Sequence, residues 1–171
     1  MVELILAITL LVGDSPVTLV KELMRQEIEY LGQTGRGDPL AGEALNRLFT
    51  DDLREAFQDV IDLQVALGEP LIDGDPITGR QEYCPTLQGV TVDRDFETQT
   101  TAGVTATFQS QWCFPEAGPE IAGEVTEIVF HLVKRNGEWR VADFDHSLYG
   151  SFREHLQYLM ATVQTPAPAG P

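Results

Sequence analysis

Two aspartates and a histidine lie close together in RVADFDHS, residues 140–147, at the end of an apolar alternation typical of a buried strand. Carboxylates and imidazoles are the side chains that most often transfer protons in enzymes. Whether Asp143, Asp145 and His146 can act together depends on which face of the strand each one occupies, because side chains alternate between the two faces of a sheet.

The hairpin that ends in this strand predicts those faces. Asn136 and Gly137 favour a two-residue turn, which aligns the residues before and after it in antiparallel pairs. One face is then the more apolar and should pack on the core: Ile128, Phe130, Leu132, Trp139, Val141, Asp143 and Asp145. His146 falls on the other face, opposite Glu127, so Asp143 and His146 point in opposite directions.

Asp143 is the strongest single candidate for chemistry. Opposite Phe130 it would be a lone carboxyl on an apolar face, where it could act as a general base toward a bound small molecule. Tyr83 and Tyr149 are candidate hydrogen-bond donors for such a site. The predicted ligand-binding pocket is lined by Phe130, Trp139, Trp112 and Asp145. The alternative is that Asp143 lies at the wet rim of the sheet and accepts a backbone hydrogen bond from the following loop.

The residue types predict neither a cofactor nor a metal. Glu127, His131 and His146 share one predicted face, but ligands at sheet spacing on an open face are a weak metal signal and fit a cross-strand surface contact better. The chain has no phosphate-binding glycine loop and no nucleophile elbow.

Two cysteines, Cys84 and Cys113, flank the first predicted pair of strands. If the turn between these strands is centred near Thr98, the cysteines meet at the open end of the hairpin, and a disulfide would stabilise the fold by roughly 3 to 4 kcal/mol on the loop-entropy model. If the turn lies nearer Gly103, Cys113 would face about Gln88, and two buried free thiols would be expected. A disulfide would require an oxidising compartment.

Helical spacing of apolar residues dominates the first part of the chain, and alternation dominates the second. Ser15 and Pro16 predict the start of a first helix and Gly32 a left-handed stop. Thr50 is expected to cap a later helix that ends at Gly68. Helices are predicted at 16–31, 40–48, 51–67 and from 152 onward, and strands at 90–96, 104–112, 125–134 and 138–145. This order predicts an α+β fold.

Several of these segments resemble a known superfamily. FTDDLREAF, the hairpins and NGEWRVADF resemble the nuclear transport factor 2-like (cystatin-like) superfamily, and DPITGRQEYCP is similar to an uncharacterised bacterial family within it. The resemblance implies a cone-like curved antiparallel sheet packed on N-terminal helices, with a C-terminal helix. It also implies a choice between isomerases, cyclases or dehydratases and non-catalytic modules, because the superfamily contains both.

Composition limits the classes of partner. The chain carries 27 acidic and 11 basic residues, a net charge of −16, which would repel the nucleic-acid backbone. No apolar run approaches the roughly 20 residues that cross a bilayer. We expect residues 1–13 to be a signal peptide or an apolar arm, 14–163 a single domain and 164–171 a disordered tail.

Together these features predict an exported, non-catalytic bacterial module, periplasmic or secreted, that binds a small ligand or a protein partner. A cytoplasmic location is the alternative expectation. The alternative function is a small-molecule isomerase, cyclase or dehydratase with Asp143 as its base inside the cone.

Overall fold

Helices come before and after the sheet. The computed structural model describes residues 15–32 and 39–164, so the predicted signal peptide or apolar arm and residues 165–171 of the predicted tail lie outside the described residues. The helices are α1 (Pro16–Leu31), α2 (Gly42–Leu48), α3 (Asp51–Leu67), the short α4 (Pro119–Ala122) and α5 (Phe152–Gln164), with a 3-10 turn at Pro115–Ala117.

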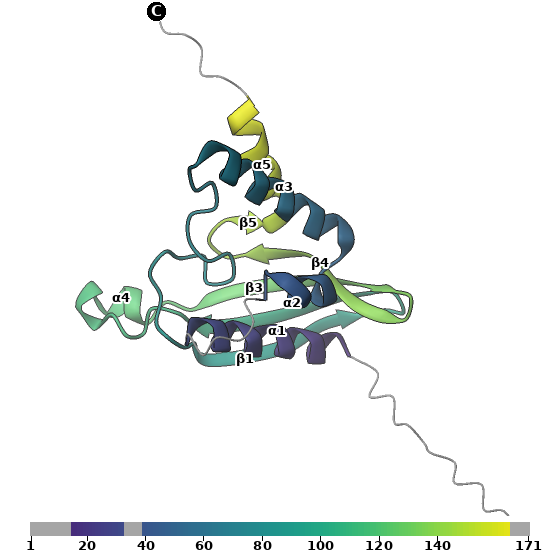
Figure 1. Cartoon of the computed structure of the whole chain (residues 1–171). Coiled ribbons are helices and arrows are strands. Elements are labelled where there is room, and N and C mark those ends of the chain that lie inside the picture. Colours follow the sequence, from purple (N-terminus) through teal and green to yellow (C-terminus); the bar gives the residue numbers. More distant parts are fainter. Residues whose placement is uncertain (1–14, 33–38, 165–171) are drawn as a thin grey trace, which may run out of the picture.

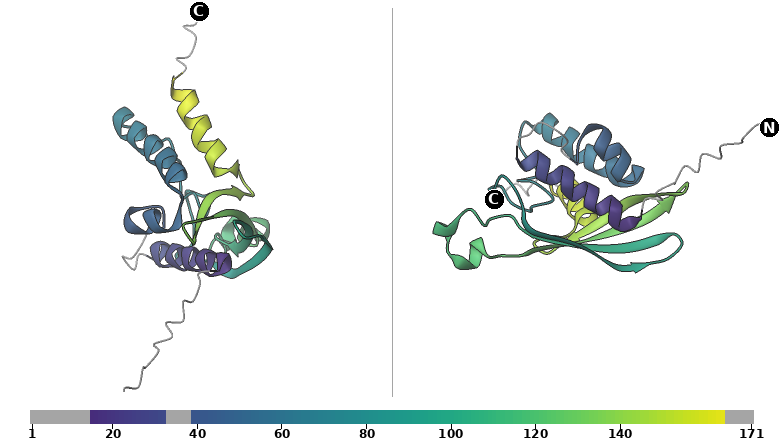
Figure 2. Two further views of the ribbon diagram at one scale, coloured as in Figure 1. Left: turned by 90° about the vertical axis from the view of Figure 1, so that its right-hand side faces the viewer. Right: turned by 90° about the horizontal axis from the view of Figure 1, so that it is seen from below.

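The sheet is antiparallel throughout and follows the order of the chain. Its strands are β1 (Gln88–Glu97), β2 (Thr101–Gln109), β3 (Thr126–Arg135), β4 (Glu138–His146) and β5 (Gly150–Ser151). The helices α1, α2, α3 and α5 lie on one side of the curved sheet, and no described helix covers the other side of its central strands (Figures 1 and 2). The predicted α+β class, with N-terminal helices, a curved antiparallel sheet and a C-terminal helix, is confirmed.

Local signals explain some of the helix ends. Thr50 stands directly before α3 as predicted, but its side chain makes no capping hydrogen bond. The Ser15 hydroxyl accepts a hydrogen bond from the Thr18 N–H at 3.1 Å, directly before the proline that begins α1. Gly68 ends α3 in the left-handed conformation, with φ of 69°. The left-handed stop predicted at Gly32 is wrong: its φ is −71°, and α1 ends through hydrogen bonds from the Gly32 N–H to carbonyls of its own last turn.

The core lies between the sheet and the helices. Its largest fully buried side chains come from both layers: Leu23, Met24, Leu48, Phe49, Leu53, Ile77, Phe108, Ile128, Phe130, Leu132, Phe144 and Phe152. Phe144 of β4 stacks on Phe152 of α5, with ring centroids 4.6 Å apart. This aromatic pair attaches the C-terminal helix to β4, the strand next to the β5 edge of the sheet.

The β3–β4 hairpin begins in the predicted register. Asn136 and Gly137 have φ of 52° and 86°, as a two-residue hairpin turn requires. The pairs remain as predicted as far as Leu132 with Val141. A β-bulge then leaves Ala142 without a partner in the ladder, and every later pair is shifted by one residue.

The bulge exchanges the two faces of the second half of β4. His131 pairs with Asp143, and Phe130 pairs with Phe144 instead of Asp143. The predicted placement of Asp143 and Asp145 on the core face is therefore wrong, because a shift of one residue moves each following side chain to the opposite face. His146, predicted outside and opposite Glu127, is instead 2% exposed and pairs with buried Ile128.

The first hairpin has the earlier of its two predicted turns. The Thr98 N–H donates to the Thr101 carbonyl at 2.8 Å, and Glu97 pairs with Ala102. The open end of this hairpin brings Cys84 and Cys113 into a disulfide, with Cα atoms 5.7 Å apart. The predicted pairing of the two cysteines is confirmed.

Candidate functional site

Asp143 joins the end of β4 to the start of α5. Its Oδ1 accepts hydrogen bonds from the N–H groups of Phe144 at 2.9 Å and Arg153 at 3.0 Å. Its Oδ2 accepts from the Ser151 hydroxyl at 2.7 Å, and the Ser151 oxygen accepts from the Glu154 N–H at 3.1 Å. The carboxylate therefore caps α5, which is the backbone-bonded arrangement that the sequence left open as the alternative to a base.

His146 lies inside the molecule and binds a segment far from it in sequence. Its Nδ1 accepts from the Leu148 N–H at 3.0 Å, so Nε2 carries the proton and donates to the Ile77 carbonyl at 3.2 Å. Burial is the main cause that lowers the pKa of His146 to about 4, so its ring is neutral at pH 7.

We call Asp75–Gly79, the segment that meets His146, the inner turn. Asp75 Oδ1 accepts from the N–H groups of Ile77 at 2.9 Å and Thr78 at 2.6 Å, which makes the turn rigid. Gly79 has φ of +66°, and a Cβ there would lie 2.5 Å from Cε1 of His146. Only glycine fits this close approach without a shift of the histidine.

Tyr149 holds the inner turn next to His146. Its hydroxyl donates to the Pro76 carbonyl at 2.6 Å, and its ring stacks on His146 with centroids 4.6 Å apart. Burial raises the pKa of the Tyr149 phenol far above its ordinary value. Tyr149 thus donates to the backbone of the inner turn.

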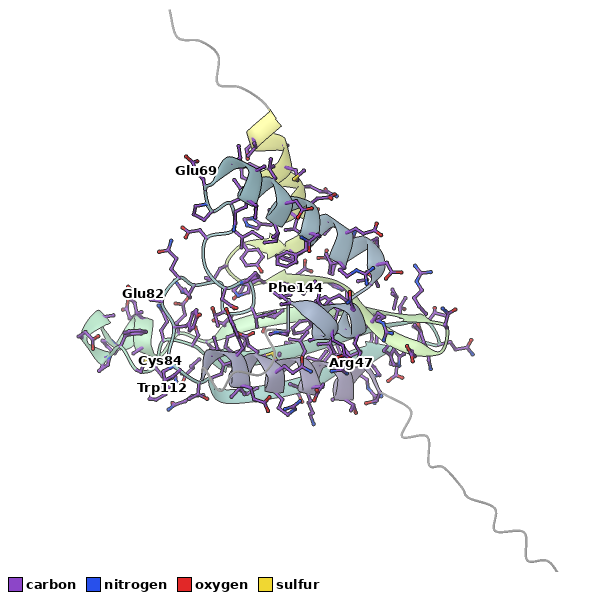
Figure 3. The ribbon with its side chains drawn as sticks, viewed as in Figure 1. Arg47, Glu69, Glu82, Cys84, Trp112 and Phe144 are labelled. Atoms are coloured by element: carbon purple, nitrogen blue, oxygen red, sulfur yellow. A yellow bond between two sulfur atoms is a disulfide. The ribbon has the colours of Figure 1, made fainter. Side chains whose placement is uncertain are left out.

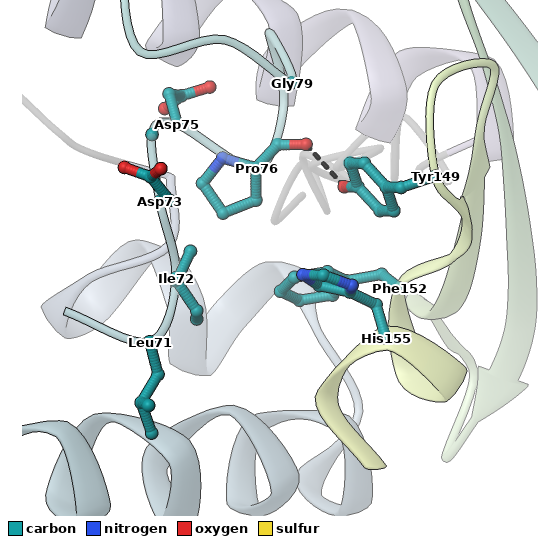
Figure 4. Close-up of a pocket in the computed structure, with 10 residues that line it drawn as sticks. Leu71, Ile72, Asp73, Asp75, Pro76, Gly79, Tyr149, Phe152 and His155 are labelled. Carbon is teal, nitrogen blue, oxygen red and sulfur yellow. Dashed lines mark hydrogen bonds between the residues drawn. The ribbon is translucent and has the colours of Figure 1, made fainter. Parts of the chain in front are cut away.

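A small pocket opens beside the inner turn (Figure 4). It has a volume of about 170 Å³ and is lined by Leu71, Ile72, Asp73, Gly74, Asp75, Pro76, Gly79, Tyr149, Phe152 and His155. Burial lowers the pKa of His155, which is half-buried at its wall. Ligand pockets usually have roughly 300 to 1,000 Å³, so this one can accept only a small chemical group.

The predicted tyrosines lie in different pockets. Tyr83 lines a second pocket of about 250 Å³ with Tyr30, Phe57 and other residues of the helices. Both pockets include Asp75 and Pro76, so the first part of the inner turn forms a wall of each. Tyr83 and Tyr149 are therefore not brought together at one ligand position.

The four residues predicted to line a ligand pocket are also separated. Phe130 is fully buried and packs on Phe144, and Trp139 is 3% exposed. Trp112 lies beside the disulfide, where its Nε1 donates to the Thr86 carbonyl at 3.0 Å, away from Phe144 (Figure 3). Asp145 lies on the opposite side of the sheet from Phe130.

That opposite side is a surface that we call the open face. Its half-buried and exposed residues include Thr91, Asp93, Phe96, Thr105, Thr107, Glu127, Val129, His131, Val133 and Asp145. His131 Nε2 lies 2.7 Å from Asp145 Oδ2, with the side chains 43% and 49% exposed. The Phe96 ring, 49% exposed, lies over Gly103, where a Cβ would come within 2.5 Å of it.

The inner turn and the place of Asp145 on the open face were not predicted from the sequence. The inner turn has a recognisable signal, since Asp-Pro followed by Thr-Gly favours a turn with an aspartate cap. The residues that it contacts, His146 and Tyr149, are about seventy positions away, and no local pattern connects them. Only the place of Asp145 on the open face depends on the bulge, which brings Asp145 beside His131.

Within 15–32 and 39–164, no three histidine, cysteine, aspartate or glutamate side chains come together as a metal site would need. None of the described helices has both the length and the apolar character to cross a membrane.

Comparison with known proteins gives a likeness in fold. No protein-family model matches the chain, and no curated protein matches its sequence. The structure is similar to a chain of the crystal structure of the type VI native effector-immunity complex Tae3-Tai3 from Ralstonia pickettii, with a TM-score of 0.52 and 16% sequence identity. The match covers 80% of this chain and 98% of that one. At this identity the likeness concerns the fold.

Proposed function

We propose that this chain is a protein-binding module that uses the open face and needs no catalytic group. The observation that carries the proposal is the open face itself. It extends over neighbouring strands, and apolar Phe96, Val129 and Val133 lie on it among polar residues. Apolar residues among polar ones on an uncovered sheet face match the composition of non-obligate protein interfaces, which are about as apolar as the rest of a protein surface.

The hydrogen bonds inside the molecule support a non-catalytic role. The carboxylate of Asp143 already accepts three hydrogen bonds, from Phe144, Arg153 and Ser151. The donors of His146 and Tyr149 are directed at backbone carbonyls of the inner turn. A general base must be free to accept a proton from a substrate, and these groups would have to break structural contacts first.

The fold likeness agrees with this proposal. The similar chain belongs to a complex of an effector with an immunity protein, in which one protein binds another. We extend to the present chain only the idea that the fold serves to bind a protein. We also keep as a proposal that the domain belongs to the nuclear transport factor 2-like superfamily, which the curved sheet and its covering helices support.

The Cys84–Cys113 disulfide supports a periplasmic or secreted location. Disulfides persist in oxidising compartments and are reduced in most bacterial cytoplasms. The proposed module therefore acts outside the cytoplasm.

Site-specific photo-crosslinking in the source cells tests the proposed function. Benzoylphenylalanine placed at Thr105 or Val129 on the open face should crosslink to one defined protein, and excess unlabelled chain should compete with it. The matched control is Asp62, exposed on α3 on the other side of the molecule. Equal crosslinking from Asp62, or none from the open face, would overturn the proposal. Turnover of a small molecule that requires Asp143 would favour the enzyme instead.

A further inference from the structure

The edge of the sheet next to the open face is formed by β1. This strand has ten residues and pairs only with β2 among the described residues, so backbone N–H and C=O groups along its other side are not used by a neighbouring strand. Most of its side chains are exposed, and only Val90 and Val92 are partly buried. The ladder to β2 is irregular between Gln88 and Thr91 and between Arg94 and Phe96. The regular stretch between these two points is an open edge that can accept an added strand from another chain.

An apolar groove lies along this edge on the helix side. It has a volume of about 340 Å³ and is lined by Lys21, Met24, Arg25, Ile28 and Glu29 of α1 and Val90 and Val92 of β1. Figure 1 shows α1 running beside β1. Arg25 pairs with Glu22 and Glu29 on the helix surface, so the charges are held at the rim of the groove.

The other side of the same edge is acidic. Asp93 pairs with Thr105 and so lies toward the open face, exposed and without an ion pair in the described parts of the chain. Asp95 is also exposed and accepts a hydrogen bond from the Thr105 hydroxyl at 2.7 Å. Arg94 does not neutralise them, because it pairs with Glu97 at 2.8 Å.

We propose that β1 accepts an extended segment of a basic protein partner as an added strand. Side chains of an added strand alternate in direction. One set would enter the apolar groove beside Val90 and Val92, and the other would lie beside Asp93 and Asp95. The segment therefore alternates apolar residues with lysine or arginine. This inference rests on the proposed protein-binding function and names the partner's chemistry.

Charge argues against a second copy of the chain as the occupant. An antiparallel pair of β1 strands centred on Arg94 would place Asp93 of each copy opposite Asp95 of the other, and like charges directly opposite destabilise a sheet. Each copy also carries a net charge of −16. A basic segment is instead attracted by the negative charge of the chain and of Asp93 and Asp95.

The test uses a fluorescent peptide of about ten residues that alternates valine and lysine. Binding to the full chain is measured by fluorescence anisotropy, beside a peptide of the same composition with its valines and lysines in two blocks. The alternating peptide should bind at least about tenfold more tightly than the block peptide. Two methylated forms of the alternating peptide are compared, one methylated at the odd-numbered backbone nitrogens and one at the even-numbered ones. Only one form should lose binding, because only alternate N–H groups of an added strand face β1.

Charge-reversal variants locate the site. The double variant Asp93→Lys, Asp95→Lys should bind the alternating peptide at least about tenfold more weakly than the wild type. Asp59→Lys with Asp62→Lys on exposed positions of α3 changes the net charge equally and should change affinity less than about twofold. Equal affinity for the two peptides, equal effects of the two double variants, or dimers of the chain that form through β1 would overturn the inference.

The two proposals fail separately. A cellular partner that crosslinks to the open face but binds the Asp93→Lys, Asp95→Lys variant normally would overturn strand addition at β1 and leave the protein-binding function intact. Absence of any partner at the open face would overturn the proposed function itself. Loss of that cellular partner in the same variant, with the α3 variant unaffected, would support both.

Discussion

Replacing Asp143 separates a structural carboxylate from a catalytic one. In Asp143→Asn the remaining oxygen can still accept from the N–H groups of Phe144 and Arg153. The new amide nitrogen takes the place of Oδ2, so the Ser151 hydroxyl loses its acceptor. The negative charge at the start of α5 is lost as well. Asp143→Ala removes all three hydrogen bonds.

The magnitudes follow from these losses. A hydrogen bond to a charged group contributes about 1.5 to 3 kcal/mol, and a carboxylate at a helix N-terminus about 0.3 to 1 kcal/mol. Asp143→Asn should therefore lower the free energy of unfolding by about 2 kcal/mol, which lowers the Tm of a domain of this size by about 4 to 8 °C. Asp143→Ala should cost about 3 to 5 kcal/mol, since it leaves three donors without their acceptor.

Thermal unfolding at neutral pH, followed by circular dichroism, checks this order. Asp145→Asn is the matched control, because Asp145 pairs with His131 on the exposed side of the same strand. A surface pair of this kind contributes about 0 to 1 kcal/mol, so the Tm of the control should change by at most a few degrees. An Asp143→Asn protein with an unchanged or higher Tm would refute the capping argument and indicate a carboxylate kept for function at a cost in stability.

Three further perturbations test the inner turn and the disulfide. Folding lowers the pKa of His146 from 6.5 to about 4, so the unfolded chain binds a proton more readily than the folded one. The free energy of unfolding should therefore fall by about 2 kcal/mol from pH 7 to pH 4.5. Urea titrations at both pH values should show this fall for the wild type and a smaller one for His146→Gln. Gly79→Ala should lower the free energy of unfolding by about 2 to 4 kcal/mol, because of the positive φ and the contact of the new Cβ with the His146 ring. The control Gly68→Ala has φ of +69° but open space around the Cβ, so it should lose only about 1 kcal/mol. Similar Tm values for the two variants would contradict the predicted clash. Replacing Cys84 and Cys113 together by serine should lower the stability by about 3 to 4 kcal/mol, and an unchanged Tm would rule out the loop-entropy contribution.

Local signals predicted most of the elements. Ser15 with Pro16 starts α1, and Asn136 with Gly137 makes the hairpin turn, because each of these pairs determines the backbone where it stands. The disulfide followed from the first hairpin, since Cys84 and Cys113 meet whenever its turn lies near Thr98. Features of this kind can be predicted because the interacting residues are neighbours or are aligned by one turn.

The candidate site could not be predicted in the same way, because it depends on one unpaired residue. Regular alternation from Val141 places Asp143 inside and Phe144 outside, which is the arrangement that the sequence analysis assumed. Phe144 and Val141 can share the core face only if the strand gains a residue between them, and Ala142 is that residue. Two apolar residues at odd spacing in one strand are therefore the signal for the bulge.

The bulge also explains why the acids of RVADFDHS are tolerated in a strand next to the core. Without it, Asp143 and Asp145 would face Phe130 and its neighbours, and burying an unpaired carboxylate there would be strongly unfavourable. With it, Asp143 reaches the N-terminus of α5, where backbone donors and the helix dipole stabilise a negative charge. Asp145 reaches the open face beside His131, where solvent and a partner can contact it. One extra residue thus assigns the first acid to the fold and the second to the surface proposed to bind a protein.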